Sequence, residues 1–134
     1  MMVLDSAMQA IQILLVEDNG ILNKVMACYL VGMGLQVTTA RTVERAMYLL
    51  HNQCFDVLVT DMHLPDNCGI GLVRLLRDSS TPVVVMTAED TVFFREQVRH
   101  AGAAVFLEKP FPLVSLKRIL NRLLAGYRYF PSSP

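Results

Sequence analysis

Two periods of apolar residues alternate along the chain. Short runs that are apolar almost throughout predict strands, and the longer segments between them, with apolar residues three and four positions apart, predict helices. We place the strands at residues 11–16, 35–39, 55–60, 82–86 and 104–107, and the helices around residues 22–32, 43–50, 72–76, 94–101 and 116–123. Parallel neighbours need crossover connections, so this order predicts an α/β fold: a single doubly wound, five-stranded parallel sheet with five helices on its two faces.

Residues that begin or end helices support these boundaries. Gly32 and Gly34 close the first helical segment and Gly102 the fourth, because glycine commonly follows the last helical turn. Thr42 is the expected N-cap of the second helix, and Pro112 suits the first turn of the last one.

The length of 134 residues indicates one domain. We assign residues 10–125 to this domain and residues 1–9 to an N-terminal extension. Residues 126–134 lose the helical period and end in proline and serine, so we interpret them as a C-terminal tail or the start of a linker.

Composition and charge exclude several classes of protein. A hydrophobic content of 53% excludes intrinsic disorder. Twelve basic and twelve acidic residues cancel, so we expect no direct nucleic-acid binding by this segment. The longest apolar run, residues 25–35, is shorter than the ~20 residues of a membrane-spanning helix, and the first ten residues lack the features of a secretory signal. We therefore expect a cytoplasmic protein with no membrane contact, whose three cysteines are reduced thiols.

Polar side chains gather where the predicted strands end. Glu17 and Asp18 follow the first strand, Asp61 the third, Thr87 the fourth and Lys109 the fifth. The carboxyl ends of parallel strands lie at one edge of the sheet, where ligands of open α/β folds bind. We therefore expect three carboxylates, a hydroxyl and a lysine to converge there.

Such a group of charges favours metal and phosphate chemistry. Three neighbouring carboxylates repel one another, and a divalent cation with oxygen ligands relieves this, best Mg²⁺ and alternatively Mn²⁺. Lys109 is then a counter-ion for a phosphoryl group, and Thr87 can donate a hydrogen bond to it. The central carboxylate can itself act as the nucleophile and form an aspartyl-phosphate.

These residues resemble, over about residues 10 to 125, the receiver domain of two-component response regulators, and chemotaxis receivers in particular. Each motif alone is unspecific, but five in order at successive strand ends are specific. The matching positions are Glu17-Asp18, Asp61, Thr87, Phe106 and Lys109-Pro110, with Pro65, Gly69 and Ala101-Gly102-Ala103 between them. The resemblance implies a flavodoxin-like strand order 2-1-3-4-5 and a cis Lys109-Pro110 bond.

The resemblance also implies a role for each residue. Asp61 would accept a phosphoryl group from a sensor histidine kinase or a histidine phosphotransfer protein. Asp18, Asp61 and the backbone carbonyl of His63 would bind Mg²⁺, with Glu17 acting mainly through a bound water. Lys109 would contact the phosphoryl oxygens. We thus interpret the chain not as an enzyme but as a signalling switch that catalyses its own phosphotransfer and dephosphorylation.

The output side of the switch is implied in the same way. Thr87 would close on the phosphoryl group and Phe106 would change rotamer with it, although an apolar strand residue such as Phe106 is equally interpretable as permanent core. His63 and Glu89, each two residues past a site residue, would tune the dephosphorylation rate. The responding surface would be the fourth helix, fifth strand and fifth helix, through which a homodimer is a hypothesis.

Two departures and three alternatives stay open. The acidic pair is Glu-Asp rather than the commoner Asp-Asp, and Asp66-Asn67-Cys68-Gly69 replaces the family's usual loop, which leaves its shape undetermined. The main alternative is a receiver-shaped protein-interaction module that works without phosphorylation. A dehalogenase-type hydrolase would need a second aspartate where His63 stands, and a flavodoxin would need a phosphate-binding loop where Glu17 and Asp18 stand.

Overall fold

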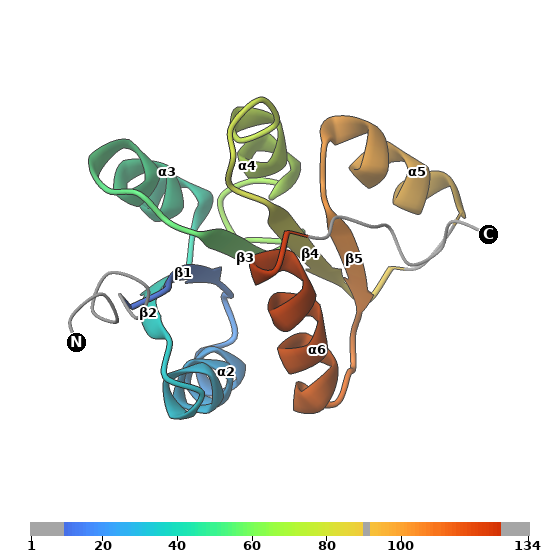
Figure 1. The fold of residues 1–134 in the computed structure, drawn as a ribbon. Coiled ribbons are helices and arrows are strands. Elements are labelled where there is room, and N and C mark those ends of the chain that lie inside the picture. The colour runs from blue at the N-terminus through green and yellow to red at the C-terminus, as the bar shows by residue number, and fades with distance from the viewer. Residues whose placement is uncertain (1–9, 90–91, 127–134) are drawn as a thin grey trace.

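A computed structural model describes residues 10–89 and 92–126 and contains one parallel sheet (Figure 1). The strand order is β2-β1-β3-β4-β5, which confirms the predicted doubly wound sheet and its order. Every neighbouring pair is parallel, with Val16 opposite Ala40 and Thr60 at the site end of the sheet. The strands are β1 (Gln12–Val16), β2 (Gln36–Ala40), β3 (Val57–Asp61), β4 (Val83–Thr87) and β5 (Val105–Glu108).

Helices cover both faces of this sheet. Helices α3, α4 and α5 lie on one face, and α2 and α6 on the other (Figure 1). In the described residues, they are α2 (Gly20–Gly32), α3 (Val43–Asn52), α4 (Ile70–Leu75), α5 (Val92–Ala101) and α6 (Leu113–Leu124).

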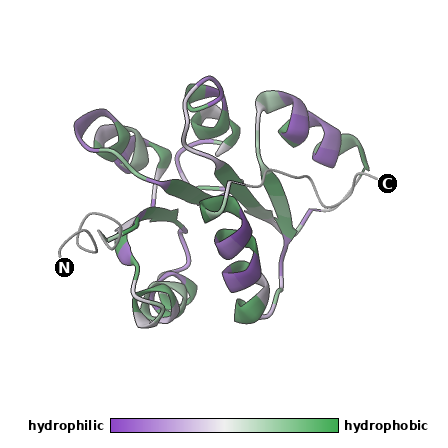
Figure 2. Cartoon of the chain, viewed as in Figure 1, coloured by the Kyte–Doolittle hydropathy of each residue, from purple (hydrophilic) through white to green (hydrophobic). Residues whose placement is uncertain are grey.

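The core consists of two apolar layers because successive side chains of a strand point to opposite faces. In β1, Leu14 and Val16 face the α3–α4–α5 layer, whereas Ile13 and Leu15 face the α2–α6 layer. The central strands are mostly hydrophobic, whereas the outer helices carry both hydrophobic and hydrophilic residues (Figure 2). The edge strand β2 is the exception, with an alternating, partly exposed pattern as its sequence predicts.

Several predicted boundaries are wrong by one or two residues. Strands β3, β4 and β5 each extend one residue further, so Asp61 and Thr87 are the last residues of their strands rather than the first beyond them. Phe55 lies before β3, not in it. Pro112 is the N-cap of α6 and precedes its first turn.

Other boundary predictions are confirmed. The Thr42 hydroxyl accepts a hydrogen bond of 3.1 Å from the Arg45 amide and caps α3. Gly34 and Gly102 follow α2 and α5 with φ of 89° and 113°, a backbone region that disfavours other residues. Residues 1–9 and 127–134, the predicted extension and most of the predicted tail, lie outside the described residues. Among the described helices, none combines the length and the apolar character needed to cross a bilayer.

Candidate functional site

An ion-paired cluster lies at the carboxyl ends of β1, β3 and β5. The Lys109 ammonium is 2.7 Å from Glu17 Oε1 and 2.9 Å from Asp61 Oδ2. Both carboxylates are buried, since Glu17 is 1% and Asp61 7% exposed. The structure thus brings together three of the five residues that the strand ends pointed to, and one lysine charge stands between two carboxylates.

The protonation state of Lys109 follows from these contacts. Burial alone lowers the pKa of its ammonium, but the hydrogen bonds that it donates to Glu17 and Asp61 and the charges of both carboxylates outweigh this effect. The pKa of Lys109 therefore lies above its ordinary value, and the lysine stays charged at any physiological pH.

Local hydrogen bonds hold the cluster in place. The Lys109 amide donates to the Thr87 carbonyl at 2.8 Å, at the end of the β4–β5 ladder, and the Lys109-Pro110 bond is cis as expected. Glu17 is held from α2, because the Asn19 amide donates to its Oε2 at 3.0 Å and the Asn23 side chain donates to its carbonyl at 2.9 Å. The two carboxylate oxygens of Glu17 are thus both engaged.

Asp61 is held by the loop that follows it. The His63 amide donates to Asp61 Oδ1 at 3.2 Å. Gly69 packs against the same turn so closely that a Cβ there would lie 2.4 Å from the Asp61 carbonyl oxygen. Gly69 therefore marks a close backbone approach, which explains the glycine at this point of the loop.

Asp18 lies apart from the ion-paired cluster. Its side chain is exposed at the rim, and within residues 10–89 and 92–126 its carboxylate makes no hydrogen bond or ion pair. Its backbone carbonyl is instead fixed by the Arg41 guanidinium at 2.9 and 3.1 Å. Asp18 thus has an exposed carboxylate, while its backbone carbonyl is bound by Arg41.

Thr87, Glu89 and His63 are connected to one another beside the ion-paired cluster. Thr87 is fully buried, and its hydroxyl accepts a hydrogen bond of 3.0 Å from the Glu89 amide. Glu89 Oε1 is 2.8 Å from His63 Nε2, and both side chains are more than half exposed. His63 and Glu89, the two residues predicted to tune the dephosphorylation rate, are therefore in direct contact with each other.

Phe106 is buried in this structure. Only 3% of it is exposed, its ring meets the edge of Phe94 with centroids 6.3 Å apart, and the Arg95 guanidinium lies 4.8 Å from its centroid. Phe94 in turn stacks on His63, with centroids 6.1 Å apart. A set of ring contacts thus connects the site loop to β5.

The donor atoms at the site suit a hard divalent cation. Carboxylate and backbone carbonyl oxygens are available from Asp18, Asp61 and His63. No three His, Cys, Asp or Glu side chains among the described residues converge into a closed metal cage. That arrangement fits Mg²⁺, which keeps several waters and takes one or two carboxylates, better than a cation that needs a full set of protein ligands.

Sequence reasoning missed two residues that shape this edge. Arg41, which follows β2, is not among the predicted site residues, yet its guanidinium binds the backbone carbonyl of Asp18. Asp66, in the loop of undetermined shape, binds the Val43 and Glu44 amides at the start of α3, both at 2.9 Å. An aspartate in a loop beside a helix start is a capping signal only once the two are known to be neighbours.

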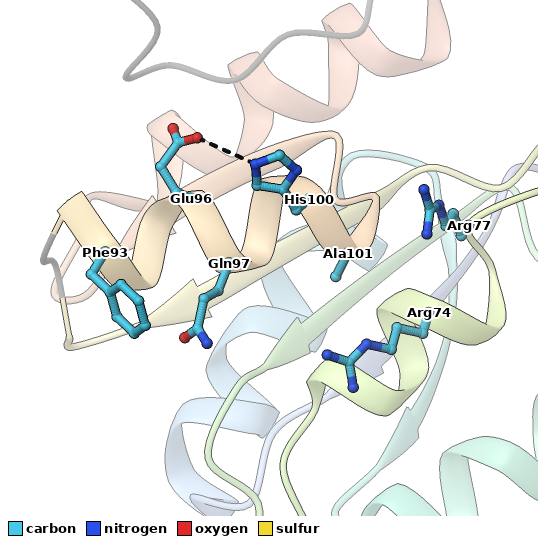
Figure 3. A pocket seen from close by; sticks show the side chains of 7 residues that line it. All are labelled: Arg74, Arg77, Phe93, Glu96, Gln97, His100 and Ala101. Atoms are coloured by element: carbon cyan, nitrogen blue, oxygen red, sulfur yellow. Dashed lines mark ion pairs between the residues drawn. The ribbon is translucent and has the colours of Figure 1, made fainter.

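Two hollows on the surface contain none of the site's acidic groups, and only the first of them borders a site residue. One, of about 390 Å³, borders Lys109 and is otherwise mostly apolar; it is lined by Leu22, Val25, Ala88, Lys109, Pro110, Phe111 and Leu113. The other, of about 430 Å³, separates α4 from α5 (Figure 3) and is lined by Arg74, Arg77, Phe93, Glu96, Gln97, His100 and Ala101.

Comparison with known proteins decides the family. The sequence model of the response regulator receiver domain matches residues 13–121. The chain belongs to this family. It is 31% identical over 115 residues to the transcriptional regulatory protein PhoP of Escherichia coli (strain K12), covering 84% of this chain and 52% of that protein. The receiver therefore spans about half the length of this relative.

Solved receiver structures have the same fold. The non-phosphorylated HemR receiver domain of Leptospira biflexa superposes with a TM-score of 0.81 at 31% identity, over 88% of this receiver and 97% of that chain. The BeF₃-activated receiver domain of DrrB, a Thermotoga maritima protein, superposes with a TM-score of 0.80 at 25% identity, over 87% and 99%. The predicted membership of the two-component response regulators is thus confirmed.

Proposed function

We propose that this receiver accepts a phosphoryl group on Asp61 from a phosphohistidine of a histidine kinase or phosphotransfer protein. The observation that carries the proposal is the burial of Asp61 beside Lys109, with the ammonium 2.9 Å from Oδ2. A carboxylate oxygen can act as the nucleophile at phosphorus, and Lys109 places a positive charge next to the atoms that would receive the transferred group.

The transfer is a simple displacement at phosphorus. A carboxylate oxygen of Asp61 forms the new P–O bond while the P–N bond to the histidine breaks, and the imidazole nitrogen keeps that electron pair. Lys109 stabilises the negative charge on the transferred group, and the His63 amide orients the carboxylate through Oδ1. Dephosphorylation is the attack of water on the same phosphorus, which returns phosphate and the free carboxylate.

Magnesium, or alternatively manganese, completes this site. Asp18, Asp61 and the His63 carbonyl would hold the ion, with Glu17 acting through a water, and when bound it neutralises charge on the phosphoryl oxygens. The exposed position of Asp18 supports this assignment, because its carboxylate has no competing partner among the described residues.

The output follows from Thr87 and Phe106. After transfer, the Thr87 hydroxyl turns from its present bond with the Glu89 amide toward the phosphoryl oxygens, and Phe106 responds. The responding surface consists of α5, β5 and α6, through which the phosphorylated form dimerises. Sedimentation with and without beryllium fluoride tests this part: a monomer in both conditions would contradict the dimer alone.

The partners and location follow from the family and the surface. The apolar hollow of about 390 Å³ beside Lys109 offers a phosphodonor protein a contact surface next to the acceptor. The balanced charge of the chain supports action through protein contacts in the cytoplasm, without direct contact of this segment to nucleic acid. The alternative function is a protein-interaction module of the same shape that never carries phosphate.

Phosphorylation by a small donor distinguishes the two functions. The receiver is incubated with Mg²⁺ and acetyl phosphate, and its intact mass is measured. We expect a gain of one phosphoryl group that is absent in Asp61→Asn, absent with EDTA, and retained in the matched control Asp56→Asn, which lies just before the same strand. No gain with any donor would favour the interaction module, and a gain that persists in Asp61→Asn would place the acceptor elsewhere.

A further inference from the structure

A continuous set of contacts runs from the acceptor loop to Phe106 by way of α5. It begins at the Glu89 amide, which donates to the Thr87 hydroxyl at 3.0 Å, and the Glu89 carboxylate is 2.8 Å from His63 Nε2. The His63 ring stacks on Phe94 at 6.1 Å and 16° between planes. Phe94 then meets Phe106 edge to face, at 6.3 Å and 76°.

We propose that Phe94 is a positioning residue that couples the occupancy of the acceptor site to the position of the Phe106 ring. The proposal rests on the proposed function, because it concerns how phosphorylation of Asp61 reaches the output surface. It adds a second route, through His63 and the first turns of α5, to the direct one from Thr87 to the neighbouring strand β5.

The contacts explain how a change at Thr87 would reach the Phe106 ring. If Thr87 turns toward a phosphoryl group, the Glu89 amide loses its acceptor and the Glu89–His63 pair shifts with its loop. Phe94 is packed between the His63 and Phe106 rings and cannot keep both contacts unless it follows. Stacked and edge-to-face rings have preferred geometries, so the Phe106 ring is biased as well.

The same helix provides a matched control residue. Phe93, the neighbour of Phe94, is 73% exposed and lines the groove between α5 and α4 (Figure 3), and it makes no ring contact among the described residues. Substituting Phe93 changes the same residue type one position away on α5. A difference between the two positions therefore reports the ring contacts of Phe94 and not a general effect on α5.

Fluorine NMR tests the coupling in the folded protein. The chain is labelled with fluorophenylalanine at its six phenylalanines, and the Phe106 signal is assigned with Phe106→Leu. Mg²⁺ and beryllium fluoride are then added to saturation, and the fluorine signal of bound beryllium fluoride reports occupancy of the acceptor site independently. The measured quantity is the ratio of shifted to unshifted Phe106 signal at full occupancy.

We expect Phe94→Leu to lower this ratio about threefold, the size of effect that one aromatic pair has on an equilibrium. His63→Ala should lower it equally, the double variant should add nothing, and the conservative Phe94→Tyr should restore the parent ratio. Phe93→Leu should leave it unchanged. A purely structural role of Phe94 would lower the melting temperature and leave the ratio at full occupancy unaltered.

The outcomes separate the two proposals. If bound beryllium fluoride is seen in every variant and Phe94→Leu keeps the parent ratio, the coupling through Phe94 is wrong and the proposed function stands. An equal loss in Phe93→Leu also overturns it. If the parent protein binds no beryllium fluoride, the proposed function fails and the coupling falls with it.

Discussion

Two aspartates at opposite ends of β3 have different surroundings. Asp56, just before the strand, is exposed, and its carboxylate accepts a hydrogen bond of 2.7 Å from the Gln12 amide. Asp61, the last residue of the strand, is 7% exposed and is paired with Lys109. The side chains are identical, so the chemistry that we propose for Asp61 depends on its burial and on Lys109, which follows β5.

The comparison also explains why the site lies at the carboxyl end. There the strand ends deliver Glu17, Asp61 and Lys109 into one partly buried cluster, which water screens poorly. At the amino end, the polar groups mainly fasten the chain: Thr81 donates to the Phe55 carbonyl at 3.0 Å, and Asp56 holds the start of β1. The carboxyl end of the sheet therefore gathers charged side chains, whereas hydrogen bonds at the amino end hold the starts of the strands in place.

Removing the lysine tests this contrast with the largest expected effect. In Lys109→Met, the two buried carboxylates face each other without a counter-ion and the transferred group loses its cationic contact. We expect the rate of phosphorylation by acetyl phosphate to fall on the order of 100-fold. Lys117→Met, an exposed lysine of α6, is the control and should react at the parent rate. Equal rates in both variants would contradict the role of Lys109.

Adding a side chain at Gly69 tests whether the close backbone contact with Asp61 is needed at the carboxyl end of the sheet. A Cβ in Gly69→Ala would stand 2.4 Å from the Asp61 carbonyl oxygen, so the loop must move. We expect the free energy of unfolding to fall by roughly 2 kcal/mol, as for other overpacked sites, and phosphorylation to slow. Gly71→Ala in α4, where a Cβ has open space, is the control in denaturant titrations. Similar stabilities for the two variants would show that the loop accommodates a Cβ at residue 69 without loss of stability.

The sequence was sufficient for the fold because its signals were local and repeated. Uniform apolar runs in β1, β3 and β4 predict strands covered on both faces, and the burial of all their residues beyond Gln12 confirms it. The exact strand ends were missed because a polar residue such as Asp61 ends the apolar pattern while its backbone still pairs, here opposite Met86. Hydrophobic patterning reports side chains, whereas strand ends depend on backbone hydrogen bonds.

The site was predictable in its residue types but not in its contacts. The rule that strand ends meet at one edge placed Glu17, Asp61 and Lys109 near one another before any coordinates. The rule did not predict that Lys109 bridges the two carboxylates or that His63 contacts Glu89. It also did not predict that the Asp18 side chain is exposed. These depend on side-chain rotamers and loop paths, which single-residue patterns do not encode.

Substituting the anchoring aspartate is expected to have a smaller effect, on stability alone. Asp56→Ala removes the acceptor of the Gln12 amide and should lower the free energy of unfolding by about 1 kcal/mol, the usual net contribution of a hydrogen bond. The phosphorylation rate should not change. Asp56→Asn keeps an acceptor oxygen and should lie close to the parent in denaturant titrations. A loss of phosphorylation in Asp56→Ala would contradict the division between the two ends.

Substituting Asp66 tests whether position at the carboxyl end of the sheet is enough to involve an aspartate in the chemistry, or whether burial is also needed. We expect the smallest effect here. It lies at the carboxyl end, as Asp61 does, but it is exposed, and among the described residues its carboxylate binds backbone amides alone, as that of Asp56 does. The hydrogen bonds from Val43 and Glu44 lower the pKa of its carboxyl below the ordinary 3.8. Asp66→Ala should therefore melt a few degrees below the parent at neutral pH and be phosphorylated at the parent rate.

The pH dependence of this difference has a definite sign. A carboxyl whose pKa is lowered by folding stabilises the protein fully above its unfolded value of 3.8, and the contribution is lost as the pH falls through the lower folded value. The gap in melting temperature between parent and Asp66→Ala should thus be constant near neutrality and narrow below pH 3.8. A gap that widens in acid would mean that the bonds from the Asp66 carboxylate to the Val43 and Glu44 amides do not stabilise the start of α3. A slower phosphorylation rate with an unchanged gap would mean that location at this edge, without burial beside Lys109, is enough to involve a carboxylate in the chemistry.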